Sequence, residues 1–391
     1  MRTFRQANFG RILGAHFAAD HLLGSWNRRR RRCRGHRHVA GRRRHHSGGA
    51  NTVLEQVRTE LMRSYYRPVP ANVLREPSVS AMLGALRDPY TEYLDPTKLR
   101  LLRLETRSSY SGIGVGVLPD GSGLRVVRLK DGPARRAGLR IGDVITSIDG
   151  LSVAEAGFDR SVAKVLGPES TTVRVVVRRG PEELHFDVIR ARLSAPSVQS
   201  KLLAIRKLRI GYLRLSAFRT GAAPVVSATL AKLARSNAAG IVLDLRGNPG
   251  GVFEQAVAVA SLFLDRGVIV TLIGAHARPQ VYSSTKTTAT RLPLVVLVDR
   301  DSASAAEIVA AALQENRRAV LVGEHTFGKA VVQSLRPLPN GAALRLTTAT
   351  YLTPAGHDIN LRGVKPDLIA RDLPSTRADE GLNAALELFL R

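Results

Sequence analysis

The chain contains 391 residues, more than one ordinary hydrophobic core organises, so two or three domains are expected. Hydrophobic residues make up 44% and charged residues 23%, which excludes an acidic disordered chain and a collagen-like chain, and the single cysteine excludes a disulfide-stapled mini-protein. The formal net charge of +27 is typical of proteins that bind nucleic acids, which makes the location of the basic residues the first question.

The first 50 residues carry nearly half of this charge. They contain 13 arginines and one acidic residue, and the stretch from Asn27 to His46 has almost nothing to bury, so we expect a disordered tail. Three interpretations stay open: an electrostatic arm for phosphate or anionic lipid, a solvated tail, and a start that is not native to the protein. In the rest of the chain the excess of basic residues is spread thinly, so a nucleic acid is not the expected partner. The sequence contains no run of about 20 apolar residues, so no transmembrane helix is predicted.

Residues 51–107 are predicted to form a small helical segment, because Val53, Val57 and Leu61 recur with a helical period. Residues 108–192 are predicted to form a compact β unit, since short β-branched runs alternate there with glycine turns. The strands expected in this unit are Ile113–Leu118, Leu124–Leu129, Val144–Ile148 and Thr172–Val177. A short helix is expected over Pro133–Leu139, with glycine at its end.

Residues 193–391 are predicted to form a layered α/β domain with a largely parallel sheet, because strand and helix patterns alternate from Ile210 onward. The continuously apolar run Gly240–Leu245 is typical of a strand that is buried on both faces. The other strands are expected at 210–215, 268–273, 294–298, 319–322 and 343–351, and the helices at 223–235, 252–264, 304–314 and 381–390.

Two of the predicted strands are followed by candidate catalytic or anion-binding residues, as is common at the strand ends of α/β proteins. The first runs into Arg246-Gly247-Asn248-Pro249-Gly250-Gly251, and its paired glycines suit an oxyanion hole or an anion cradle, although a plain tight turn is the simpler interpretation. The second leads to Ser302-Ala303-Ser304-Ala305-Ala306-Glu307, where small neighbours leave the Ser304 hydroxyl open at the start of a helix.

A serine nucleophile needs a base. His276, His325 and His357 are expected in polar loops, as exposed histidines, and they are poor candidates. Lys329 stands alone in an apolar, glycine-containing stretch of the kind that removes water from an ammonium group and lowers its pKa. A neutral lysine can take the proton of a serine hydroxyl, and Gln333, four residues on, lies on the same face and could orient the amine. A surface lysine remains the competing interpretation.

These segments, in this order, resemble the carboxyl-terminal processing (tail-specific) serine proteases, a family with an internal PDZ domain. The resemblance covers about residues 51–370. The matching motifs are Asp88-Pro89-Tyr90-Thr91-Glu92-Tyr93, Ser111-Gly112-Ile113-Gly114-Val115, Gly142-Asp143-Val144-Ile145, Gly211–Phe218, Leu243–Gly251, Ser302–Glu307, Thr326–Gln333 and Gly363–Asp367.

The resemblance implies a crotonase-like layered α/β protease core, a PDZ β domain and an N-terminal helical segment. In the family, the nucleophilic serine precedes a lysine by 25 positions, and a glutamine follows the lysine by four. The positions of Ser304, Lys329 and Gln333 have this spacing, which selects Ser304 over Ser302.

The implied reaction is peptide-bond cleavage by a Ser-Lys dyad of Ser304 and Lys329 with Gln333 assisting. N–H groups of Ala305 and of Gly250 or Gly251 would stabilise the oxyanion, and neither a metal nor a cofactor is expected.

The PDZ domain would hold the carboxyl-terminal tail of a protein substrate, expected to be accessible and apolar, at Gly112, Ile113 and Gly114. A PDZ peptide-binding scaffold on an inactive core is the alternative. By resemblance, the protein would reside in the cell envelope, with membrane association through its N-terminus.

Overall fold

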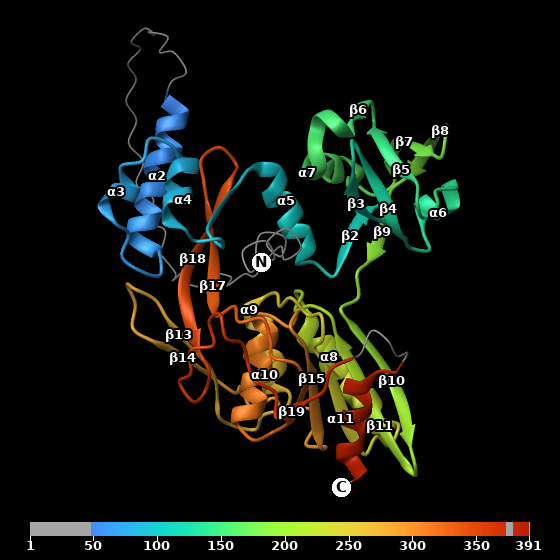
Figure 1. Cartoon of the computed structure of the whole chain (residues 1–391), viewed down its shortest axis with the longest axis vertical. Coiled ribbons are helices and arrows are strands. Elements are labelled where there is room, and N and C mark those ends of the chain that lie inside the picture. Colours follow the sequence, from blue (N-terminus) through green and yellow to red (C-terminus); the bar gives the residue numbers. More distant parts are fainter. Residues whose placement is uncertain (1–47, 373–377, 391) are drawn as a thin grey trace, which may run out of the picture.

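The computed structural model describes residues 48–372 and 378–390 (Figure 1). Most of the tail predicted over residues 1–50 therefore lies outside the described residues, and Gly48 already belongs to helix α2 (Gly48–Ser64). The described chain forms a group of N-terminal helices, a β-rich unit and an α/β core. In Figure 1 the β-rich unit stands apart from the core, beyond helix α5 (Pro96–Glu105).

The N-terminal helices share a hydrophobic core with a hairpin from the far end of the chain. Helices α2, α3 (Ala71–Leu74) and α4 (Val79–Leu86) precede strand β1 (Glu92–Leu94). Val57 and Leu61 of α2 are fully buried, and they lie in one cluster with Leu344 and Leu346 of strand β18 (Ala343–Leu352). The predicted helical segment therefore packs on residues that follow it by almost 300 positions.

The β-rich unit surrounds a core of aliphatic side chains to which all of its strands except the short β6 contribute. Its strands are β3 (Val115–Asp120), β4 (Gly123–Leu129), β5 (Val144–Ile148), β6 (Leu151–Ser152), β7 (Thr172–Arg179) and β8 (Glu182–Ile189), with helices α6 (Pro133–Ala137) and α7 (Val153–Val165). The paired strands β2 (Ser109–Gly112) and β9 (Ala191–Ser194) connect it to the rest of the chain.

The strand predicted over Ile113–Leu118 begins two residues later, at Val115, because Gly114 adopts a left-handed backbone angle (φ 87°) that breaks the extended chain between β2 and β3. Strand β8 was not predicted, since its sequence Glu-Glu-Leu-His-Phe-Asp-Val-Ile is rich in charged residues.

The predicted parallel sheet forms the centre of the α/β core. Its order is β10-β11-β12-β15-β16-β19, parallel from β11 to β19, with β10 antiparallel at one edge. The strands are β10 (Val198–Ile205), β11 (Leu208–Leu215), β12 (Gly240–Asp244), β15 (Leu294–Val298), β16 (Val320–Gly323) and β19 (Leu368–Ile369).

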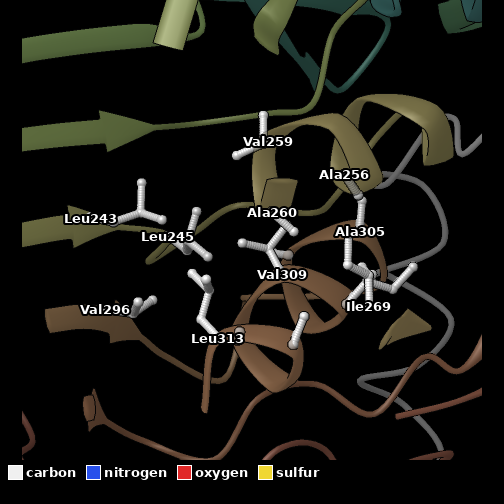
Figure 2. Close-up of a cluster of buried hydrophobic side chains, with 14 of the residues drawn as sticks. Leu243, Leu245, Ala256, Val259, Ala260, Ile269, Val296, Ala305, Val309 and Leu313 are labelled. Atoms are coloured by element: carbon white, nitrogen blue, oxygen red, sulfur yellow. The ribbon is translucent and has the colours of Figure 1, made fainter. Parts of the chain in front are cut away.

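Helices cover both faces of this sheet. Helices α8 (Ala222–Arg235), α9 (Phe253–Ser261) and α10 (Ala305–Glu315) pack on one face, where Leu243, Val296, Val259, Val309 and Leu313 form part of one buried cluster (Figure 2). Helix α11 (Glu380–Glu387) and the 3-10 turn Leu388–Leu390 pack on the other face.

A second, antiparallel sheet was not predicted. Strand β18 pairs with β1, with β13 (Val268–Ile273) and with β17 (Val331–Pro337), and β14 (Gln280–Ser283) extends the sheet beyond β13. The strand at 268–273 thus leaves the alternating β-α-β series and joins a partner about 80 residues further along the chain. The antiparallel sheet matters for the site, since β17 carries Gln333.

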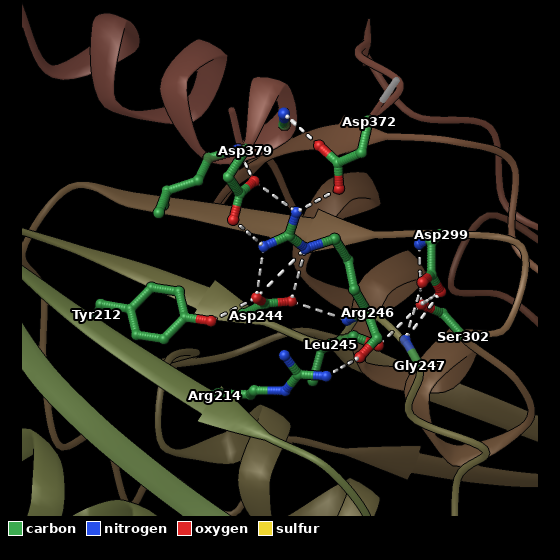
Figure 3. Close-up of polar contacts among 12 residues, drawn as sticks. Tyr212, Arg214, Asp244, Leu245, Arg246, Gly247, Asp299, Ser302, Asp372 and Asp379 are labelled. Atoms are coloured by element: carbon green, nitrogen blue, oxygen red, sulfur yellow. Dashed lines mark hydrogen bonds and ion pairs between the residues drawn. The ribbon is translucent and has the colours of Figure 1, made fainter. Parts of the chain in front are cut away.

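A partly buried ion-pair network fixes the C-terminal helix to the end of strand β12 (Figure 3). Asp244, fully buried, accepts hydrogen bonds from the guanidinium group of Arg246 and from the hydroxyl of Tyr212 (2.6 Å). Arg246 also pairs with Asp379, the N-cap residue of α11, and with Asp372. One arginine therefore holds the start of α11 beside the loop that follows β12.

Among the described helices, none is long and apolar enough to cross a membrane.

Candidate active site

Three loops meet at the carboxyl ends of the central strands. We name them the glycine loop (residues 245–251, after β12), the serine loop (299–304, after β15) and the lysine loop (324–330, after β16). The N–H of Ala303 donates to the carbonyl of Asn248 (2.9 Å), and the N–H of Phe327 donates to the carbonyl of Ser302 (3.0 Å). Backbone hydrogen bonds thus join the serine loop to both of its neighbours.

Ser304 lies at the junction of the serine loop and helix α10. Its backbone has φ 53° and ψ −111°, a conformation that residues other than glycine rarely adopt, and its side chain is almost completely buried. Strained residues of this kind cluster at functional sites, and a sharp turn from strand to helix presents a hydroxyl at the helix start. This unusual backbone conformation belongs to Ser304 and not to Ser302. The hydroxyl of Ser302 instead donates a hydrogen bond to the carbonyl of Leu245 (2.8 Å).

Glu307 connects the serine loop to the lysine loop from inside the protein. This fully buried carboxylate accepts hydrogen bonds from the N–H groups of Ser304 (2.7 Å), Gly328 (2.7 Å) and Lys329 (2.9 Å) and from the hydroxyl of Thr326 (2.5 Å). Burial raises the pKa of Glu307, and the four donors oppose this by stabilising the charged form. Glu307 lies in the motif Ser302–Glu307, but the motif alone assigns it no role.

Lys329 is 5% exposed and makes no ion pair among the described residues. Its Nζ atom lies 4.6 Å from the centre of the Tyr90 ring. The pKa of Lys329 is lowered to about 7, chiefly by burial and also by the nearby cation Arg345, whereas Asp88 and Glu307 act in the opposite direction. The predicted desolvated lysine is therefore present, and a surface position is excluded.

Two further side chains surround the serine and the lysine. The buried hydroxyl of Tyr351 contacts the carbonyls of both Ser304 (3.2 Å) and Lys329 (2.8 Å). Gln333 in β17 is buried, and its Nε2 has no hydrogen-bond partner among the described residues. Among the described residues, no hydrogen bond joins Ser304 Oγ to Lys329 Nζ.

The two glycines proposed for the oxyanion hole differ in their hydrogen bonding. The N–H of Gly250 donates to the Oδ1 atom of buried Asn248 (2.8 Å). The N–H groups of Gly251 and Ala305 donate to no hydrogen bond within the described residues. Gly251 has φ 144°, and a Cβ there would lie 2.2 Å from the carbonyl oxygen of Phe218, so only glycine fits.

The remaining predicted residues lie away from these loops. Gly112, Ile113 and Gly114 belong to the β-rich unit, where the carbonyls of Ile113 and Gly114 accept hydrogen bonds from the N–H groups of Ala134 and Lys130, both 2.9 Å. The three histidines of the polar loops, His276, His325 and His357, are exposed, as expected.

Comparison with known proteins identifies the family. The model of peptidase family S41 matches residues 209–370, and a PDZ domain model matches residues 126–179. The carboxyl-terminal-processing protease of Picosynechococcus sp. is 36% identical over 334 residues, which cover 83% of this chain and 81% of that protein. The chain belongs to peptidase family S41.

Other family S41 members support the same assignment. The carboxyl-terminal-processing protease of Synechocystis sp. is 35% identical over 343 residues, which cover 84% of this chain and 80% of that protein. The solved structure of a photosystem II D1 C-terminal processing protease is 30% identical, with a TM-score of 0.56 over 84% of this chain and 95% of its own. The predicted family, the serine-peptidase class, the PDZ domain and the mixed α/β fold are thus confirmed.

Replacing Glu307 by glutamine should destabilise this S41 protein. An amide offers one acceptor atom where the carboxylate has two, so two buried donors would face an NH₂ group. The expected loss in free energy of unfolding is about 2 to 5 kcal/mol, measured by urea denaturation. Glu315→Gln is the matched control on the same helix, because that partly exposed carboxylate accepts from the N–H of Ala355 in a surface loop. Equal losses in the two variants would contradict the structural role of Glu307.

Proposed function

We propose that this protein is a serine endopeptidase in which Ser304 is the nucleophile, Lys329 the general base and Gln333 an assisting residue. The observation that carries the proposal is a buried lysine with no carboxylate partner in the described chain, held by Glu307 in one hydrogen-bonded unit with a strained serine. An amine in that environment is neutral near physiological pH and can accept a proton.

The proposed reaction begins with Ser304. Neutral Lys329 takes the proton from the Ser304 hydroxyl, and Oγ attacks the scissile carbonyl. The N–H groups of Gly251 and Ala305 donate to the oxyanion, since that of Gly250 is already bonded to Asn248. The lysine ammonium then protonates the leaving amine, and a water molecule activated by Lys329 hydrolyses the acyl-enzyme.

Lys329 Nζ has to shift toward Ser304 Oγ for this proton transfer, because it lies 4.6 Å from the centre of the Tyr90 ring and makes no hydrogen bond to Oγ among the described residues. The long lysine side chain can make this change by rotation about its own bonds. Gln333, with its unpaired buried amide, is suited to hold the amine at the serine without adding a charge that would keep it protonated.

We further propose that the PDZ domain holds the substrate by its carboxyl-terminal tail. The N–H groups of Ile113 and Gly114 would bind the terminal carboxylate, and apolar side chains nearby would take an apolar last residue. In support, neither N–H donates to a hydrogen bond within the described residues, and Gly114 has the left-handed conformation (φ 87°) of a tight turn. The cell-envelope location implied by the resemblance stays a prediction, and the tail that would contact a membrane falls outside the described residues.

The tail hypothesis predicts that kcat/KM depends on a free carboxylate at the substrate's end. A peptide with an apolar carboxyl-terminal tail should be cleaved with a kcat/KM about 10 to 100 times higher than the same peptide with an amidated end, because hydrogen bonds to a charged group are lost on amidation. An N-terminally acetylated peptide, which changes the charge at the other end, serves as the control. Equal kcat/KM values for the free and amidated ends would contradict tail recognition.

The rival function is a PDZ scaffold on an inactive core, and a serine-directed phosphonate probe separates the two. Covalent labelling of Ser304 in the folded protein, located by mass spectrometry, would support the peptidase. A folded protein that the probe does not label would favour the scaffold.

A further inference from the structure

The motif Asp88–Tyr93 reaches the active site from the opposite end of the sequence. Helix α4 ends at Leu86, its C-cap residue Arg87 has a left-handed conformation (φ 52°), and the chain then turns toward the lysine loop before β1 begins. This turn brings the face of the Tyr90 ring to 4.6 Å from the Lys329 Nζ atom. The turn therefore places an aromatic ring face beside the amine.

A network of hydrogen bonds fixes the turn that carries Tyr90. The Asp88 carboxylate accepts from the N–H of Tyr90 (2.9 Å) and from the hydroxyls of Thr91 (2.7 Å) and Tyr65 (3.2 Å). The Thr91 hydroxyl oxygen accepts from the N–H of Thr347 in strand β18 (3.1 Å). The turn is thereby attached both to Tyr65, the residue that follows helix α2, and to the sheet that carries Gln333, so the position of the ring is set by the fold.

The Tyr90 ring is the group that faces the Lys329 ammonium directly. A cation within about 6 Å of a ring centre is attracted by the electron-rich face of the ring, most strongly when water is excluded. Three charged groups also act on Lys329 without an ion pair among the described residues: Asp88 on the Tyr90 turn, Glu307 on α10 and Arg345 on β18. Arg345 is itself paired with Glu92 (2.7 Å), and the hydroxyl of Tyr351 is bonded to carbonyl groups.

We propose that Tyr90 is a positioning residue whose ring face holds the protonated form of Lys329 and frees the neutral amine to reach Ser304. The inference rests on the proposed Ser-Lys function and deepens it. A neutral amine is attracted far less by the ring, so deprotonation would itself release the side chain toward the serine. The ring would therefore set the pH at which the base becomes available, although it takes no part in proton transfer.

The test is to weaken the ring face while keeping its shape. Fluorinated phenylalanines at position 90, with an increasing number of ring fluorines, progressively remove the electron density that attracts a cation. We expect the pH midpoint of kcat/KM to fall by about 0.5 to 1.5 units from phenylalanine to the trifluoro form, and Tyr90→Phe to remain near wild type. Tyr90→Leu should also lower the midpoint. Tyr93→Leu is the matched control and should leave the midpoint unchanged. Tyr93 lies in the same motif, but its hydroxyl accepts a hydrogen bond from the side-chain amide of Asn340.

A second measurement makes the outcome independent of catalysis. The ¹³Cε signal of Lys329, assigned by comparison with Lys329→Arg, reports its protonation directly by NMR, and its midpoint should fall along the same fluorination series. A constant midpoint across the series would overturn the role of Tyr90. If the NMR midpoint moves while kcat/KM keeps its pH profile, the ring acts on Lys329 but Lys329 is not the base, and the proposed dyad is what fails.

Discussion

Ser304→Ala is expected to lower kcat by about 10⁴- to 10⁶-fold on a protein substrate with an apolar tail, because the covalent route to the acyl-enzyme disappears. KM should change little, since the PDZ domain and the rest of the site stay intact. Quantitative mass spectrometry of the products measures the rate, and loss of labelling by a serine-directed phosphonate gives a second readout.

Ser302→Ala is the matched control for this experiment, two residues away in the same loop. Its hydroxyl bonds the Leu245 carbonyl and accepts from the Asp299 N–H (3.0 Å), so its removal should cost about 1 kcal/mol of stability and at most tenfold in kcat. If Ser302→Ala were inactive while Ser304→Ala still cleaved and was still labelled, the nucleophile would be Ser302.

Lys329 should give kcat/KM an acid limb with a midpoint of about 7. The neutral amine is the active form, so kcat/KM should fall about tenfold per pH unit below the midpoint and reach a plateau above it. Lys329→Ala removes the base, and Lys329→Arg keeps a charge that does not dissociate in the accessible range. Both variants are expected to lose about 10⁴-fold or more at every pH.

An unperturbed histidine also titrates near this pH, so the limb needs an independent assignment. His325→Gln is the appropriate control, because His325 lies in the lysine loop but is exposed. We expect this variant to keep the wild-type profile. A profile that loses its acid limb in His325→Gln would instead make a histidine the base.

The site residues that could be predicted from the sequence are those that follow a recognisable strand or that belong to a spaced motif. Ser304 and Lys329 follow apolar strands of the parallel sheet, and the carboxyl ends of parallel strands meet at one edge, so their proximity follows from the strand pattern. The spacing to Gln333 came from the family motif. The structure also adds what a motif does not contain: the strained backbone of Ser304 and the buried environment of Lys329.

Residues whose role depends on distant packing could not be predicted. Tyr90 meets Lys329 only because β1 pairs with β18, across some 250 positions of sequence. Such a pairing leaves no local periodicity. Asn248 is a similar case, since its side chain joins Gly250 to the carbonyl of Leu215 (2.7 Å), and a turn sequence gives no sign of that contact. The antiparallel sheet was missed for the same reason, as β13 and β18 are far apart in sequence.

The anchoring of helix α11 by Arg246 also bears on self-digestion. A peptidase that takes up flexible peptide segments, as proposed, meets segments of its own chain at a high effective concentration. Here Arg246 holds Asp379 at the start of α11, and the Phe389 ring packs so closely on Gly240 that a Cβ would lie 2.3 Å from it. Residues 380–390 are packed on the core in this way, so this segment is available neither to the proposed peptide-binding site nor to the serine.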